Sequence, residues 1–131
     1  MKLNHDCIRA MLLTLEQELS YNESLIIQEI DLDQMCGFPL MANYSREDIA
    51  YSAEKMSEAG FISYSPRYAD NSLYDAFFED ITYEGHQYLD AIRQDTIWNK
   101  IKLKMASSGG SLTFSLIQAL GIAFLKSQLG L

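Results

Sequence analysis

A helix with both of its ends encoded lies within residues 44–64, and it constrains the fold more than any other segment. Ser45 can cap the first turn with its hydroxyl, and Asp48 three residues later can complete a capping box. Gly60 suits the left-handed position that ends a helix. The β-branched and aromatic run FISYS follows at once and stops at Pro66. The segment therefore predicts a capped helix that leads directly into a strand.

The residues before this helix predict a further helix and a strand. Asn4 can cap a first helix, whose apolar residues keep helical spacing as far as Leu19. The segment from Ser24 to Ile30 is apolar enough to form a short buried strand. Between this strand and the capped helix, at most one helical turn is expected, around Asp33 to Cys36. The corner of a helix-turn-helix is therefore expected to be degraded or absent.

A hairpin and a long helix are expected after Pro66. Asp70 and Asn71 mark the tip of a β-hairpin, which would form a wing. Thr82 can cap the long helix that follows. The apolar stripe of this helix changes phase near Asp95, which can act as a new cap, so a kink or a break is expected there.

The last helix is expected after the pair Gly109-Gly110, capped by Ser111 or Thr113 and ended by Gly130. It is apolar on almost every side, so it must be buried on almost every side. Its apolar run is shorter than the roughly 20 residues of a membrane span. We therefore expect this helix to pack against protein, and no membrane span is predicted.

Together these elements predict an α+β fold that is mostly α. Residues 1–95 are expected to form a winged-helix-like domain, built from an N-terminal helix, a short strand, the capped helix and the β-hairpin wing. Residues 96–131 are expected to form a C-terminal helical extension that packs on this domain within the same globular unit. A chain of 131 residues is long enough for one such core.

Charge is distributed unevenly along the chain, whose formal net charge is −8. Residues 1–64 carry four Lys or Arg against eleven Asp or Glu, and residues 65–95 carry two against seven. Residues 96–131 carry four lysines and no acid. An acidic body repels phosphate, so DNA is not expected as a partner. The lysines can meet an acidic partner or another copy, although the simpler interpretation is that they keep an apolar end in solution.

The N-terminal residues lack the features of a signal peptide, because Asp6 and Arg9 interrupt the apolar run and no small-residue cleavage site follows. A cytoplasmic location is therefore expected. In a reducing cytoplasm, Cys7 and Cys36 are expected to be free thiols rather than a disulfide.

Four stretches of the sequence resemble one family. They are HDCIRAMLLTLE near the start, YSREDIAYSAEKMSEAGFI in the capped helix, ITYEGHQYLDAIRQDTIWNKIK in the long helix, and GGSLTFSLIQALGIAFLKSQLGL at the end. On these residues the chain resembles a family of small phage and prophage proteins, known only as the DUF2513 domain of unknown function. The resemblance spans most of the chain. It implies a winged-helix-like fold, a mobile-element origin and a bacterial host cell, and it implies no activity.

No pattern of residues predicts an enzyme, a metal site or a cofactor. The soft metal ligands are His5, Cys7, Cys36 and His86, and their spacing fits no zinc motif. No positioned base accompanies a serine or cysteine nucleophile, and no glycine-rich loop could hold a phosphate. His86 is expected to be structural, bonded to a nearby carboxylate or to the backbone. The acids of residues 75–84 can bind a divalent cation or act as a carboxylate pair, although such clusters are usually solvated surface.

Two pairs of residues are candidates for binding a protein partner. Arg67 and Tyr68 lie in the predicted wing, and Arg93 and Trp98 lie in the long helix. Aromatic residues and Arg dominate the binding hot spots of interfaces. For Trp98 the simpler interpretation is a core residue that clamps the long helix to the wing, because large aromatic side chains are mostly buried.

The last helix is a candidate for self-association, through Leu116, Leu120, Phe124 and Lys126. A domain of this size rarely surrounds a helix at its end, and a second copy can complete the burial, so a homodimer is expected. Ala119 and Gly121 would allow the close approach of a second helix. The competing interpretations are burial within the monomer and docking in the groove of a different partner.

Two main hypotheses for function follow. The first is a non-catalytic phage or prophage accessory protein that acts through protein–protein interaction on a host factor, which the acidic charge favours. The alternative is a winged-helix DNA-binding transcriptional regulator, suggested by the fold and by the two wing residues, although a fold alone does not establish a function. A third hypothesis, a small hydrolase, has only scattered acids and thiols in its favour.

Overall fold

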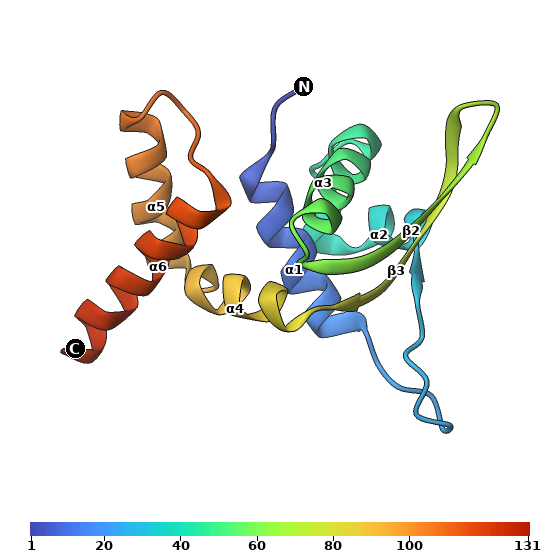
Figure 1. Cartoon of the computed structure of the whole chain (residues 1–131), viewed down its shortest axis with the longest axis horizontal. Coiled ribbons are helices and arrows are strands. Elements are labelled where there is room, and N and C mark those ends of the chain that lie inside the picture. The colour runs from blue at the N-terminus through green and yellow to red at the C-terminus, as the bar shows by residue number, and fades with distance from the viewer. The chain divides into compact units, whose positions relative to one another are not determined.

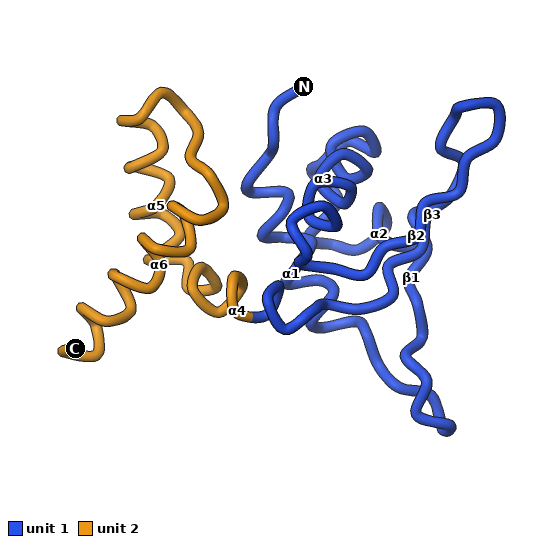
Figure 2. Tube along the Cα trace, viewed as in Figure 1, with its two compact units in different colours: residues 1–86 blue, residues 87–131 orange.

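The computed structural model describes the whole chain, residues 1–131 (Figure 1). The chain divides into two compact units, residues 1–86 and residues 87–131 (Figure 2). The elements of the first unit are α1 (His5–Glu18), β1 (Ile30–Asp31), α2 (Leu32–Gly37), the 3-10 turn η1 (Pro39–Met41), α3 (Arg46–Glu58), β2 (Ile62–Ala69) and β3 (Ser72–Ile81). The remaining elements are α4 (Tyr83–Ile92), which crosses the boundary, α5 (Asp95–Ser107) and α6 (Phe114–Leu129). The predicted α+β class with a majority of helix is confirmed, and the packing of residues 96–131 on the preceding domain stays a prediction.

Helices α1 and α3 begin where the sequence predicts. The side chain of Asn4 accepts a hydrogen bond from the backbone N–H of Cys7 at 3.0 Å. The hydroxyl of Ser45 accepts one from the N–H of Asp48, also at 3.0 Å. This bond is the half of the expected capping box that forms at α3.

Helix α3 also ends as predicted. Gly60 has a φ of +80°, and the N–H of Phe61 donates to the carbonyl of Met56 at 2.9 Å, as in a Schellman ending. The core side chains of α1, α3 and β3 are fully buried, and they include Ile8, Met11, Leu12, Leu15, Ile49, Ala53, Met56 and Phe78. The apolar stripe predicted for the first helix therefore forms a core face as far as Leu15, and α3 buries one face as well.

Helix α2 is longer than the single turn predicted for this segment. The Asp31 carboxylate accepts from the N–H of Gln34, and the Gln34 side chain accepts from the N–H of Asp31, both at 2.8 Å. This reciprocal capping box starts a helix of six residues, and Pro39 then opens η1. The glycine and proline nearby obscure this helix in the sequence.

The predicted buried strand from Ser24 to Ile30 is wrong. Only the short segment Ile30–Asp31 forms β1, which pairs with β3. The residues before it form a loop, because the Asn22 side chain accepts hydrogen bonds from the N–H groups of Ser24 and Ile26, at 2.8 and 3.1 Å. A strand would need those N–H groups for its ladder.

The sheet has three antiparallel strands in the order β1-β3-β2. Strands β2 and β3 form the predicted hairpin, with Asp70 and Asn71 at its tip at φ +51° and +64°, as a type I′ turn requires. Pro66 lies inside β2 rather than at its end, contrary to the prediction. β2 is an edge strand, and one side of an edge strand makes no ladder bonds, so a proline is tolerated there.

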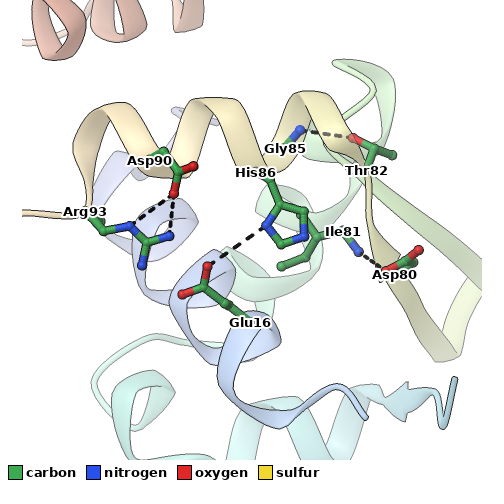
Figure 3. Close-up of polar contacts among 8 residues, drawn as sticks. All are labelled: Glu16, Asp80, Ile81, Thr82, Gly85, His86, Asp90 and Arg93. Atoms are coloured by element: carbon green, nitrogen blue, oxygen red, sulfur yellow. Dashed lines mark hydrogen bonds and ion pairs between the residues drawn. The ribbon is translucent and has the colours of Figure 1, made fainter. Parts of the chain in front are cut away.

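Helices α4 and α5 replace the single long helix. The Thr82 hydroxyl accepts from the N–H of Gly85 at 3.0 Å, which caps α4 as predicted (Figure 3). The helix is interrupted at residues 93–94, close to the predicted position. The predicted capping role of Asp95 is wrong, because Gln94 is the N-cap of α5 and makes no side-chain cap bond. Asp95 instead lies in the first turn, where its charge favours the helix dipole.

Helix α6 begins and ends at predicted residues. The Thr113 hydroxyl caps its first turn at 3.1 Å, and Gly130 ends it with a φ of +73°. The ring of Phe114 meets the ring of Tyr88 in α4 edge to face, with centroids 5.5 Å apart, and Ile117 is fully buried. None of the helices combines the length and apolar character that crossing a membrane requires.

Candidate protein-binding surfaces

A groove of about 500 Å³ lies between α3 and the β2–β3 hairpin. Three tyrosines line it, Tyr51 from α3 and Tyr64 and Tyr68 from β2. Glu47 and Glu54 line its α3 side. We call this site the tyrosine groove, and its lining combines aromatic with acidic side chains.

The local structure of α3 and β2 positions the groove residues. Glu47, Tyr51 and Glu54 follow the spacing i, i+4 and i+7, which aligns side chains along one side of a helix. In β2, the pairing register shifts immediately before Tyr64 and immediately before Tyr68. Such β-bulges increase the twist of a strand and re-aim its side chains. A helix face and a twisted strand therefore form the two walls of the groove.

The groove tyrosines differ in exposure and in partners. Tyr64 is half-buried, and its ring packs on that of Phe78 with centroids 5.1 Å apart. Burial raises the pKa of Tyr64 to about 12. Tyr68 is 58% exposed. The Nζ atom of Lys55 lies 5.4 Å from the ring centroid of Tyr51. The groove thus offers both a fixed and an accessible aromatic surface.

A smaller cleft of about 240 Å³ lies where the end of α1, the loop after it, the end of β3 and the start of α4 meet. In Figure 3, His86 points toward Glu16, whose Oε2 atom is 4.0 Å from His86 Nδ1. Asp80 also lines this cleft, and its carboxylate accepts the N–H of Ile81 at 2.8 Å. His86 therefore faces a carboxylate of α1 at a distance too long for a hydrogen bond, and its structural role stays a prediction.

Three of the four acids of residues 75–84 accept local hydrogen bonds. The Asp75 carboxylate accepts the N–H of Ala76 at 2.8 Å, and the Glu79 carboxylate accepts the hydroxyl of Ser65 at 2.7 Å. No three His, Cys, Asp or Glu side chains of the chain are grouped to hold a metal ion. Both cysteines are free thiols.

The four residues predicted to bind a partner have different local surroundings. Tyr68 lines the tyrosine groove, whereas the Arg67 guanidinium packs over a phenylalanine ring of β3, 5.3 Å from its centroid. Arg93 forms an ion pair with Asp90 (Figure 3). Trp98 is only 3% exposed, so it is a core residue, and the predicted clamp between the long helix and the wing stays a prediction.

The hairpin of α5 and α6 leaves much apolar surface exposed. Only Ile117 and Gly121 of α6 are buried, so the expected burial of this helix on almost every side is not completed within the chain. The exposed fractions are 72% for Leu103, 52% for Leu116, 41% for Ile122 and 70% for Leu129. We call these four residues the α5–α6 surface. Of the residues predicted for self-association, Leu116 and Lys126 are exposed and Leu120 and Phe124 are half-buried.

Comparison with known proteins identifies the family. The family model described as "Hypothetical protein (DUF2513)" matches residues 2–111. The chain belongs to the DUF2513 family. A relative from Haemophilus influenzae, described as an uncharacterized protein, is 29% identical over 129 residues, which cover 98% of this chain and 99% of the relative. No solved structure matches the chain.

The DUF2513 match contains the three tyrosines of the groove and ends before α6. Sequence reasoning identified Tyr68 of this groove and missed Tyr51 and Tyr64. A pattern in the sequence could have indicated them. One tyrosine lies on the polar side of the capped helix, and two more lie an even number of residues apart on the next strand. That signal becomes convincing only when the two elements are known to be neighbours.

Proposed function

We propose that this DUF2513 protein is a non-catalytic interaction protein, which binds a protein partner through the tyrosine groove. Three tyrosine side chains line one groove, and this lining supports the proposal most directly. Tyrosine is enriched in binding hot spots, because its ring offers a large contact area and its hydroxyl a hydrogen bond. A single groove of about 500 Å³ suits a segment of a partner chain.

The charge of α3 favours a protein over a nucleic acid in this groove. Arg46 donates to Asp33 at 2.6 Å, and Lys55 pairs with Glu58 at 2.9 Å. Both cations of the helix are therefore engaged with acids of the same chain, and the groove itself carries two glutamates. Binding of nucleic acid needs a net release of counterions from phosphates, which such a surface does not provide. A partner segment with basic and apolar side chains is complementary to it.

Within this proposal, the partner is a host protein of the bacterial cytoplasm, and the chain is an accessory protein of a phage or a prophage. The resemblance to small phage and prophage proteins supports this part of the proposal. The family description itself names no activity.

Affinity capture with groove variants tests the proposed function. The tagged chain is incubated with nuclease-treated extract of the bacterial host, and a captured protein is then purified for titration. Tyr68→Ser should weaken binding about tenfold or more, because it removes an exposed aromatic contact. Tyr74→Ser is the matched control, because Tyr74 is 60% exposed on β3 and does not line the groove. Equal affinities of the two variants would contradict the groove as the binding site.

The alternative function is a winged-helix DNA-binding transcriptional regulator. The order of helix, strand, two helices and hairpin favours it, together with the exposed Arg67 of the hairpin. The charge of α3 opposes it, and the titration described in the Discussion decides between the two.

We also propose that the chain self-associates as a homodimer through its last helices. The exposed leucines and isoleucine of the α5–α6 surface support this proposal, because large apolar side chains that the chain itself leaves exposed can be buried by a second copy. Light scattering at micromolar concentration tests it. A monodisperse monomer would contradict it.

A further inference from the structure

The loop between α1 and β1 exposes apolar side chains that the core does not use. Leu25 is 75% exposed, Ile26 is 62% exposed and Tyr21 is 64% exposed. We call residues 20–28 the apolar loop. Leu25 has a φ of +60°, a left-handed conformation that is uncommon for a branched apolar residue. Residues in such a conformation often lie at functional sites, because folding alone does not favour them.

The apolar loop is held together by its own hydrogen bonds. The Asn22 side chain accepts from two N–H groups of the tip, at 2.8 and 3.1 Å. At the base, the N–H of Gln28 donates to the carbonyl of Ser20 at 2.9 Å, and Tyr21 and Ile27 form an antiparallel bridge. Figure 1 shows this loop extending away from the sheet. An ordered loop loses less entropy on binding than a flexible one, so its tip is suited to docking.

The surroundings of the apolar loop are acidic. Glu18, Glu23 and Glu29 lie exposed along it. Residues 1–86 carry five Lys or Arg against sixteen Asp or Glu, a net charge of −11. Residues 87–131 carry five against two, a net charge of +3. The two units of one chain therefore have opposite charges.

The α5–α6 surface has the complementary composition. The same two helices carry the exposed lysines Lys100, Lys104 and Lys126. Pairing two α5–α6 surfaces with each other would bring the lysines of both copies together, which is unfavourable. The apolar loop offers apolar side chains surrounded by acids, so it matches this surface in both respects.

We propose that the apolar loop of one copy docks on the α5–α6 surface of a second copy. The second copy returns the same contact, so that two identical contacts close a two-fold dimer. This inference rests on the self-association proposed above and specifies the surfaces that meet. The glutamates along the loop pair with lysines at the rim, where such pairs add specificity and speed of association more than affinity.

Light scattering on the full chain and on exposed-residue variants tests the contact. Leu25→Ser with Ile26→Ser should weaken the dimer at least about tenfold, because both side chains would leave the interface. Leu40→Ser should leave it unchanged, because Leu40 is 49% exposed on the same unit and lies outside the apolar loop. Thermal melts confirm that each variant keeps the fold.

Mixing two variants separates this contact from other dimers. One variant is the loop double variant, and the other is a surface double variant that carries Leu116→Ser together with Ile122→Ser. Each of the two should be mainly monomeric on its own. In the mixture, one loop and one α5–α6 surface remain intact and face each other, so a heterodimer should appear. Failure of the mixture to form a heterodimer would overturn the inference, and so would a loop variant that dimerises like the parent.

The outcomes also separate this inference from the two proposals before it. A dimer that persists in the loop variant keeps self-association and rejects the loop as its partner. If the parent chain is a monomer, self-association and the loop contact are both rejected, and the proposal for the tyrosine groove is not affected. Sedimentation with phosphatidylcholine vesicles that contain phosphatidylglycerol measures whether the parent and the loop variant bind a membrane. Equal vesicle binding by the parent and by the loop variant, without a dimer, would assign the α5–α6 surface to a membrane and overturn the inference.

Discussion

The carbonyl oxygen of Ala91 in α4 fills the space that a Cβ atom on Gly121 of α6 would need. The same Cβ would lie 3.1 Å from the Cβ of Ala91. The two helices therefore touch through their backbones, and glycine is the residue that permits this approach. The close approach at Gly121, which the sequence predicts for a helix of a second copy, is made within one chain.

Gly121→Ala should destabilise the protein by about 1–3 kcal/mol, because the added carbon meets a backbone carbonyl that cannot move aside. The matched control is Gly37→Ala, since a Cβ at Gly37 has no atom within 4 Å. That control should change stability by less than about 1 kcal/mol. Urea denaturation measures both. Identical midpoints for Gly121→Ala and the parent would show that α4 and α6 do not meet at this glycine.

Gly60→Val should destabilise the protein by about 2–3 kcal/mol, because a β-branched residue is strained at a φ of +80°. Ser45→Ala should cost about 1 kcal/mol, since it removes the cap on the N–H of Asp48. Both effects are measured by urea melts of the purified variants. Gly60→Val should lose more unfolding free energy than Ser45→Ala. The reverse result would mean that the position after α3 tolerates a branched side chain.

Duplex DNA should bind weakly or not at all. Helix α3 carries Glu47, Asp48, Glu54 and Glu58 against Arg46 and Lys55, and both of these cations are in ion pairs. Fluorescence anisotropy at low salt, with random and promoter-derived duplexes, measures this binding. Tight, sequence-selective binding that falls steeply with added salt would favour the regulator instead.

Stability should fall in alkaline solution as the Cys7 thiol ionises. Burial raises the pKa of Cys7 from its ordinary value of 9.0 to about 11. In the unfolded chain the thiol loses its proton near pH 9, whereas the folded chain keeps it neutral. The contribution of this group is therefore fully present below pH 9 and is lost as the pH rises toward 11.

Urea melts at several pH values between 8 and 11 measure this loss, which should reach roughly 2 kcal/mol. Cys7→Ala should be less stable at neutral pH, because it leaves a cavity, and it should show a shallower decline above pH 9. Parallel declines for Cys7→Ala and the parent would contradict the assignment to Cys7.

The helix ends were predictable because each depends on a few adjacent residues. Asn4, Ser45, Thr82 and Thr113 cap their helices through side-chain bonds within one turn. The segment after α1 was not predictable in the same way. Its apolar run matches a buried strand, and only the capture of two N–H groups by Asn22 turns it into an exposed loop.

The candidate site was predictable only in part, because a groove needs two elements to meet. Tyr68 can be recognised in the sequence as an aromatic residue in a wing. Tyr51 can be recognised as a groove residue only when the hairpin is known to lie opposite it. Trp98 illustrates the reverse case. Composition cannot tell a hot-spot tryptophan from a core one, and its burial identifies it as a core residue.

The edge of the sheet at β2 has a consequence for how copies of this chain can meet. Pro66 has no N–H to donate, and the register is irregular before Tyr64 and before Tyr68, so β2 lacks a continuous row of hydrogen-bonding groups. The opposite edge, β1, is only two residues long. Along the β2 edge another molecule therefore finds no continuous template on which to add a strand. Crowded solutions of the folded protein should resist growth into amyloid-like fibrils, even though apolar residues make up 48% of the chain.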